Sequence, residues 1–163
     1  MSISLADICK IFAKYKVKFL IIGGDAAAYY GSDRVSLDYD LWIEKNEENC
    51  RNLVKALKEL GYIKSINKKI IKNKKFYYLW EIIFKHKLNR FEGDRNRKPL
   101  DIFCGDIKYK KFEKCFKRVN IEKYRGIKFP FISKKDLIEM KKQAGRKKDY
   151  YDIESIKRYG KTL

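Results

Sequence analysis

The stretch FLIIGGDAAAYYGSDRVSLDYDLWIE, residues 19–44, decides the expected fold of this chain. Its apolar opening predicts a buried strand that stops at Gly23 and Gly24, and residues 25–30 predict a short helix ended by Gly31. Residues 37–44 alternate between apolar and polar side chains, which predicts a second strand. Strands and helices that mix in this way indicate a domain in which helices pack against a sheet.

Two acidic residues stand two apart on the second of these strands. Side chains two apart on a strand project to the same side, so Asp38 and Asp40 are expected to lie next to each other. Neighbouring carboxylates repel unless a cation lies between them, and Mg²⁺ commonly takes one or two carboxylates together with substrate phosphates. The simpler interpretation is an outer strand face with two solvated acids. The expected faces are Leu37, Tyr39, Leu41 and Ile43 on one side, and Asp38, Asp40, Trp42 and Glu44 on the other.

The surroundings of the acidic pair favour a site for a phosphorylated substrate. Gly23 and Gly24 directly follow an apolar strand, and a glycine pair there lets a phosphate approach the backbone amides. An ordinary strand-to-helix turn would need the same glycines. On the strand expected at residues 100–104, Asp101 faces opposite to its apolar neighbours. Such a third carboxylate could hold a second metal ion or deprotonate an attacking hydroxyl group.

The rest of the chain completes an α/β (α+β) fold with a mixed sheet flanked by helices. Helices are expected at residues 4–15, 46–60, 133–143 and 147–159, the first and third opened by capping boxes. Strands are expected at residues 62–71, 76–86 and 100–104, with one or two more within 118–132, and residues 87–98 are expected to form a charged loop. We expect a single domain made of a core, residues 1–132, and a C-terminal helical segment, residues 133–163.

Composition restricts the class of partner. The 163 residues include 40 Lys and Arg against 21 Asp and Glu, a formal net charge of +19. Such a field attracts phosphate-rich partners, although a Lys-rich surface can also be merely solvated. An apolar content of 45% argues against global disorder. Without a membrane-length apolar run, a secretory signal or paired cysteines, the expected location is the reducing cytoplasm, away from membranes.

The stretch at residues 19–44 resembles the signature of the DNA polymerase β-type nucleotidyltransferase superfamily. That signature is an apolar strand, Gly-Gly or Gly-Ser, a short helix and Asp-x-Asp. Arg34 and Ser36, each two residues before the next motif position, make it similar to the Arg-x-Thr-x-Asp-x-Asp version of small bacterial enzymes and of abortive-infection, type IV toxins.

A second match lies downstream, in DLIEMKKQAGRKKDYYDIESI at residues 136–156. It is similar to the carboxy-terminal Lys-(four residues)-Arg-x-x-Asp-x-x-Asp-Ile segment of the same group. Lys141, Arg146, Asp149 and Asp152 fall on the four charged positions. A lysine, Lys147, follows the arginine where the group usually has proline.

The resemblance implies a magnesium-dependent transfer of a nucleoside monophosphate from a nucleoside triphosphate such as ATP to an acceptor, with Mn²⁺ as an alternative ion. The implied catalytic and metal-binding residues are Asp38, Asp40 and Asp101. The implied nucleotide-binding residues are Gly23, Gly24, Arg34, Ser36, Lys141 and Arg146. For Arg34, Lys141 and Arg146, solvated surface charge is the competing interpretation.

The acceptor and the biological setting stay open at the level of sequence. A net charge of +19 favours an RNA such as tRNA, or a protein, as acceptor over a cationic small molecule. A toxin of a toxin–antitoxin pair is compatible with the resemblance, with an antitoxin or a separately encoded helical protein as partner. The alternative function is a catalytically inactive nucleic-acid-binding module on the same scaffold.

Overall fold

The structure is a computed structural model that describes residues 3–62, 88–92, 98–108 and 110–160. Within these residues, six strands form one mixed sheet in the order β3-β4-β2-β1-β6-β5. The strands are β1 (Phe19–Ile21), β2 (Tyr39–Ile43), β3 (Leu88–Phe91), β4 (Leu100–Cys104), β5 (Asn120–Tyr124) and β6 (Ile127–Phe131). The helices are α1 (Leu5–Lys14), α2 (Gly23–Tyr29), α3 (Glu47–Glu59), α6 (Phe112–Phe116), α7 (Lys134–Ala144) and α8 (Lys147–Tyr159). The expected class, a mixed sheet flanked by helices, is confirmed.

Local capping residues explain where several helices begin and end. Ser4 and Asp7 form the expected capping box of α1: the Ser4 Oγ accepts from the Asp7 amide at 3.2 Å, and the Asp7 carboxylate accepts from the Ser4 amide at 2.9 Å. Ser133 is the N-cap of α7: its Oγ accepts from the amide of Asp136 at 3.1 Å, and its hydroxyl donates to the Asp136 carboxylate at 2.7 Å. Gly145 then ends α7 in the left-handed conformation, with φ of 64°.

Strand pairing fixes which side chains share a row across the sheet. β1 runs antiparallel to β2 and parallel to β6, and β2 runs parallel to β4. The register between β2 and β4 places Asp40 opposite Asp101. The register between β4 and the antiparallel edge strand β3 places Arg90 opposite Asp101. Directly paired residues point to the same face of a sheet, so these three side chains form one row.

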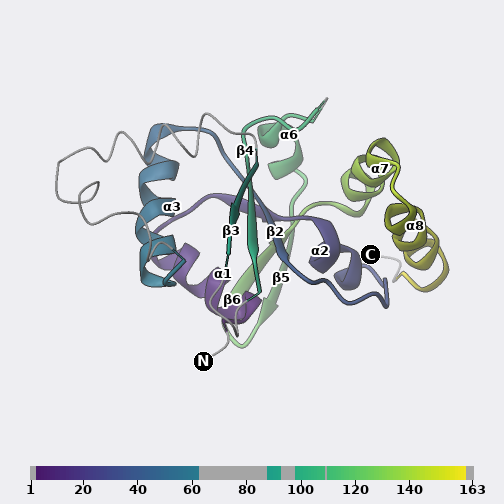
Figure 1. Ribbon diagram of the computed structural model, residues 1–163, viewed down its shortest axis with the longest axis horizontal. Coiled ribbons are helices and arrows are strands. Elements are labelled where there is room, and N and C mark those ends of the chain that lie inside the picture. Colours follow the sequence, from purple (N-terminus) through teal and green to yellow (C-terminus); the bar gives the residue numbers. More distant parts are fainter. Residues whose placement is uncertain (1–2, 63–87, 93–97, 109, 161–163) are drawn as a thin grey trace.

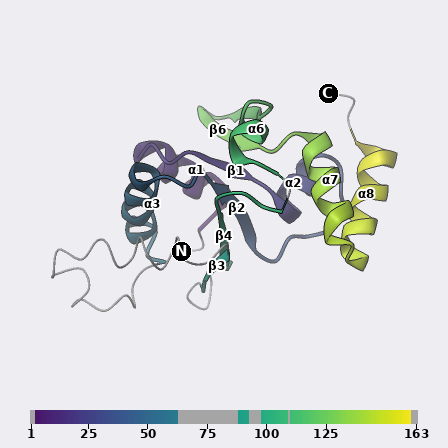
Figure 2. The same ribbon diagram turned by 90° about the horizontal axis from the view of Figure 1, so that it is seen from above.

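The helices lie on both sides of the sheet (Figures 1 and 2). In both views α1 and α3 lie together on one side, and α7 and α8 lie together on the opposite side with α2 next to them. β6 ends at Phe131 and α7 begins at Lys134, so the expected division at residue 132 falls between two elements. The division into core and C-terminal segment stays a prediction.

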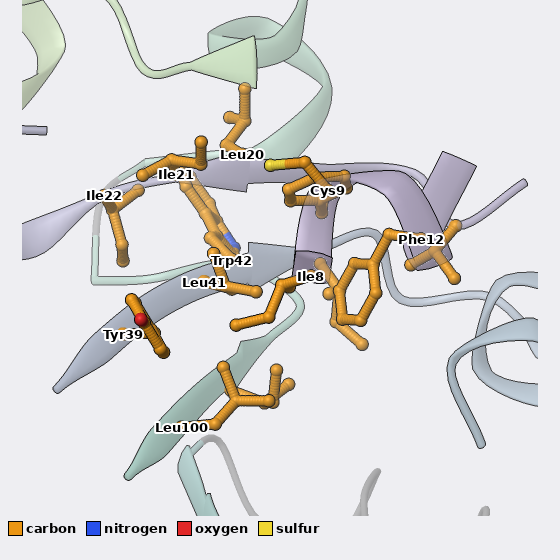
Figure 3. Close-up of a cluster of buried hydrophobic side chains, with 14 of the residues drawn as sticks. Ile8, Cys9, Phe12, Leu20, Ile21, Ile22, Tyr39, Leu41, Trp42 and Leu100 are labelled. Atoms are coloured by element: carbon orange, nitrogen blue, oxygen red, sulfur yellow. The ribbon is translucent and has the colours of Figure 1, made fainter. Parts of the chain in front are cut away.

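The core forms where α1 packs on the centre of the sheet (Figure 3). Ile8 and Phe12 of α1 are wholly buried in one cluster with Leu41 of β2 and Leu100 of β4. All four cysteines are also buried. In the described part of the chain, no helix combines the length and the apolar character needed to cross a bilayer.

The alternation of apolar and polar faces predicted for residues 37–44 is wrong at two positions. Leu37, expected on the apolar face, precedes β2 and is 77% exposed. Trp42, expected on the polar face beside the acids, is completely buried. Its ring meets Phe112 of α6 edge-on, with centroids 5.4 Å apart, and its Nε1 donates to the carbonyl of Gly105. On the expected polar face of β2, Asp40 is therefore beside the acids while Trp42 is covered by α6, a helix that the sequence analysis did not predict.

Two other expectations differ from the structure or lie outside it. The charged loop expected at residues 87–98 contains the edge strand β3, whose pairing with β4 depends on a partner distant in sequence. The short helix after the glycines begins at Gly23, two residues earlier than expected. The strands expected at 62–71 and 76–86 fall outside the described residues, apart from Tyr62, which is buried.

Candidate functional site

A pocket of about 430 Å³ opens between the sheet and the C-terminal helices. The acids of β2 and β4 form one wall, and residues from α7 and α8 form the facing wall. The lining residues are Ile22, Gly23, Gly24, Arg34, Asp38, Asp40, Asp101, Phe103, Ile107, Lys108, Leu137, Met140, Lys141, Gln143, Ala144, Arg146, Lys148 and Asp149. Of the nine residues expected to bind metal or nucleotide, the tertiary structure brings eight to this pocket. Ser36 is the ninth.

The three carboxylates come together as the sequence predicts. Asp40 and Asp101 are direct neighbours on β2 and β4, and Asp38 precedes β2 by one residue. Asp101 is 8% exposed, and the Asp38 side chain is 29% exposed. The interpretation of Asp38 and Asp40 as independent, solvated acids on an outer strand face does not describe this arrangement, since both line the pocket.

Gly23 and Gly24 fit closely around Asp40. Gly23 has φ of 62°, and a Cβ at this position would overlap the Asp40 carboxylate. The backbone N–H of Gly24 donates to Asp40 Oδ2 at 3.3 Å. A side chain at either position would displace a neighbour, because a Cβ on Gly24 would lie 2.8 Å from that of Ser36. The glycines therefore orient Asp40, a role that the sequence pattern does not reveal.

The surroundings of Asp40 disfavour its charge. Burial, strengthened by the negative charge of Asp38, raises the pKa of the Asp40 carboxyl to about 6, against the smaller opposing effect of the Gly24 hydrogen bond. Burial likewise raises the pKa of Asp101, although the Arg90 guanidinium opposes the shift. Burial therefore disfavours the charged forms of Asp40 and Asp101, and a cation bound beside them would favour those forms.

Arg90 is one member of this site that the sequence analysis missed, as it also missed the pocket-lining residues Lys108 and Lys148. Its Nη1 lies 3.1 and 3.0 Å from the two carboxylate oxygens of Asp101 and 3.4 Å from Asp38 Oδ2. Nothing in the segment around Arg90 marks it, because its position depends on the register of β3 against β4. The short stretch LNRF, in which Arg90 follows Asn89, carries no pattern that would single out this arginine.

Asp25 is a fourth acid whose charge acts on Asp38 and Asp40. Its Oδ1 lies 3.4 Å from Lys98 Nζ, and within the described residues its buried Oδ2 has no hydrogen-bond partner. Burial raises the pKa of the Asp25 carboxyl, and the charge of Asp38 adds to the shift. This side chain does not line the pocket, and it increases the local excess of acids over cations around β2.

The cations expected to contact phosphate are already engaged with carboxylates of α8. Arg34 donates two hydrogen bonds to Asp152, each of 3.1 Å, and Lys141 Nζ lies 2.6 Å from Asp152 Oδ2. Arg146 Nε donates to Asp149 Oδ2 at 2.7 Å. Asp152 is wholly buried, so these contacts are structural, whatever else the cations bind.

The two carboxylates of α8 are held in their charged form. Burial opposes the charge of Asp152, but hydrogen bonds from Arg34, Lys141 and Ser32 outweigh it and lower the pKa of the Asp152 carboxyl. Burial likewise opposes the charge of Asp149, and the hydrogen bonds and charge of Arg146 keep its pKa low. These acids are neutralised by hydrogen-bonded cations. In the described part of the chain, Arg90 contacts Asp38 and Asp101, whereas Asp40 accepts its hydrogen bond from the neutral amide of Gly24.

Ser36 stabilises the loop that carries Asp38. It is 7% exposed, and its hydroxyl donates to the Asp38 carbonyl at 2.7 Å. It packs against Gly24, where a Cβ would meet its Oγ at 2.5 Å. Ser36 thereby fixes the approach of the loop to β2 and does not line the pocket.

The donor set suits one divalent cation together with its substrate. Among the described residues, no three His, Cys, Asp or Glu side chains converge as a preformed metal site. Mg²⁺ keeps several waters and usually takes one or two carboxylates along with substrate phosphates, so a preformed cage of three ligands is not required. Asp38 and Asp40, two carboxylates on the pocket wall, meet this requirement.

Comparison of the chain with known protein families found no matching family, and comparison with curated proteins found no similar protein.

Proposed function

We propose that this chain is a magnesium-dependent nucleotidyltransferase, which transfers a nucleoside monophosphate from a nucleoside triphosphate to an acceptor hydroxyl group. The observation that carries the proposal is the convergence of Asp38, Asp40 and Asp101 on one wall of a pocket whose other wall carries cations. Neither wall exists as a unit in the sequence, since the acids come from two strands and the cations from a loop and two helices.

Each wall supplies one part of the chemistry. Asp38 and Asp40 would hold the divalent cation, which when bound neutralises phosphate oxygens and orients the triphosphate. Lys108, in the loop after β4, and Arg146 and Lys148, at the start of α8, line the pocket and are placed to attract the triphosphate tail. With a volume of about 430 Å³, the pocket falls in the range typical of sites for small ligands.

The reaction requires a group that takes up a proton. The acceptor oxygen attacks the α-phosphorus, the bond from that phosphorus to the pyrophosphate oxygen breaks, and the hydroxyl proton goes to a carboxylate. Asp101 suits this role because burial raises its pKa, which makes it a better proton acceptor than an ordinary carboxylate. The remaining contribution of the chain is positioning.

The net charge of +19 favours RNA, such as a tRNA end, or a protein as acceptor, because a positive field concentrates phosphate-rich partners. The chain would then work in the cytoplasm, where nucleoside triphosphates and RNA are available. An antitoxin or a helical partner protein belongs to the same proposal if the enzyme acts as a toxin.

The test is an incubation of the purified chain with each α-labelled nucleoside triphosphate in turn, Mg²⁺ and total RNA. Label in RNA or in protein is expected with the wild type, and label is expected to be lost in Asp38→Asn and Asp40→Asn. Asp33→Asn is the matched control, because Asp33 accepts a hydrogen bond from Tyr151 and does not line the pocket.

Two results would contradict the proposal. Full transfer by both pocket variants would remove Asp38 and Asp40 from the reaction. Salt-sensitive retention of RNA without label from any of the four triphosphates would instead support the inactive nucleic-acid-binding module.

A further inference from the structure

Arg90 occupies a defined place in the row of side chains that crosses β3, β4 and β2. The register sets Arg90 opposite Asp101, and Asp101 opposite Asp40. The edge strand thereby carries a positive charge onto the same face as the acids. Because backbone hydrogen bonds fix both pairings, the sheet determines the backbone position of Arg90 and the face to which its side chain projects.

One nitrogen of Arg90 bridges two of the three acids. Nη1 lies within 3.1 Å of both oxygens of Asp101 and 3.4 Å from Asp38 Oδ2. Nε of the same guanidinium donates to Glu92 at 2.9 Å, which holds the side chain from its other edge. A positive group between carboxylates of two strands stands where a second shared metal ion would have to bind.

Asp40 is arranged differently from Asp101. Its Oδ2 receives its hydrogen bond from the Gly24 amide, a neutral donor, whereas both oxygens of Asp101 face a guanidinium. The acids are therefore unequal: Asp101 already has a cation of the protein, and Asp40 has none among its recorded hydrogen-bond donors. Two cations cannot share the gap between Asp38 and Asp101 without strong repulsion.

We infer that Arg90 is a resident cation that takes the place of a second divalent ion between Asp38 and Asp101. The chain then binds one divalent cation, on Asp38 and Asp40, and Asp101 stays free of metal and serves as the proton acceptor. This inference rests on the proposed function, since it specifies how many ions the same acids take. It also narrows the role of Asp101, which the sequence left open between a metal ligand and a base.

The test counts bound Mn²⁺ by the electron paramagnetic resonance signal of the free ion. The wild type is expected to bind one ion per chain. Arg90→Gln is expected to bind two, with the second ion held roughly tenfold or more tightly than any second ion in the wild type. Arg90→Lys, which retains the charge, is expected to stay near one.

The control removes the same charge elsewhere. Arg51 is an exposed residue of α3 that pairs with Glu47 one turn away, so Arg51→Gln lowers the net charge equally without touching the pocket. It is expected to bind one ion. The Arg90 side chain is itself 46% exposed, and circular dichroism verifies that its variants stay folded.

The outcomes separate this inference from the proposed function. Two ions in the wild type, or one ion in both the wild type and folded Arg90→Gln, would overturn the resident cation and leave the nucleotidyltransferase proposal standing. No ion in either protein would overturn this inference, and the labelling assay described above would then decide the nucleotidyltransferase proposal by itself. Two ions in the wild type would overturn the inference without any variant, whereas a wild-type count of one has to be compared with the count in folded Arg90→Gln to assign the effect to Arg90.

Discussion

Arg34 and Asp152, far apart in the sequence, form a two-pronged ion pair in which both nitrogen-to-oxygen distances are 3.1 Å. The pair joins the loop before β2 to α8, and Lys141 of α7 reaches the same carboxylate. Each of these cations also lines the pocket. The loop that ends in Asp38 is thus held by the C-terminal helices, and the stability of those helices and the position of the acids are linked.

This linkage predicts that Asp152→Asn is strongly destabilising. The substitution removes the buried counter-charge of Arg34 and the nearer of the two buried carboxylates that face Lys141, which is 5% exposed and retains Asp149 at 3.6 Å. Loss of one partner of a buried pair costs about 3–5 kcal/mol, and urea unfolding would measure it. Glu154→Gln, at an exposed position of the same helix, should change stability by less than about 0.5 kcal/mol. Equal stability of the two variants would refute the linkage.

The close fit of Gly23 around Asp40 predicts that Gly23→Ala weakens cation binding. At φ of 62° the new Cβ would overlap the Asp40 carboxylate, which has to move away. Gly126→Ala is the matched control, because Gly126 has φ of 78° but meets nothing within 4 Å. The control should lose only the stability that an alanine forfeits in the left-handed conformation, about 1–2 kcal/mol. Mn²⁺ titration and thermal unfolding measure both effects, and unchanged Mn²⁺ affinity in Gly23→Ala would contradict this explanation.

The raised pKa of Asp40 predicts how stability changes with pH when no divalent ion is present. Because the folded pKa is about 6 and the unfolded value about 4, the folded state holds its proton more tightly. Stability should therefore fall as pH rises from about 4 through 6, by at most roughly 3 kcal/mol from this group. Asp40→Asn removes that penalty.

The measurement is chemical unfolding in EDTA at pH 4, 6 and 8. Asp40→Asn should be more stable than the wild type at pH 8, and the difference should shrink toward pH 4, where the folded-state carboxyl is protonated and the unfolded-state carboxyl is about half protonated. A variant less stable than the wild type at pH 8 would show that the carboxylate is not penalised by its surroundings.

The cationic wall predicts a difference between two adjacent lysines. Lys148 lines the pocket, and Lys147, also exposed, does not. Lys148→Ala should weaken triphosphate binding about fivefold, because an exposed charge pair contributes up to about 1 kcal/mol. The loss should be smaller at high salt, which screens exposed charges. Lys147→Ala should have little effect. Fluorescent-nucleotide titration of both variants makes the comparison, and equal losses would point to general surface charge instead.

The sequence was sufficient to predict those features of the structure that depend only on residues close together in the chain. Ser4 with Asp7, and Ser133 with Gly145, set helix ends that the structure confirms. The spacing of Asp38 and Asp40 also predicted that the two acids would lie close together, and both line the pocket although Asp38 stands one residue before β2. Asp101 was recognisable as the polar position of an otherwise apolar strand, because alternation along a strand is a property of the backbone.

What required the tertiary structure depends on pairing between distant segments. The burial of Trp42 follows from α6, and the bridge from Arg90 to Asp101 follows from the register of β3. The partner of Arg34 is supplied by α8. The sequence by itself therefore determined which residue types stand next to each other along each element. Only the packing of elements decided which charges meet, because the free energy of a buried ion or aromatic ring depends on the groups that folding brings around it.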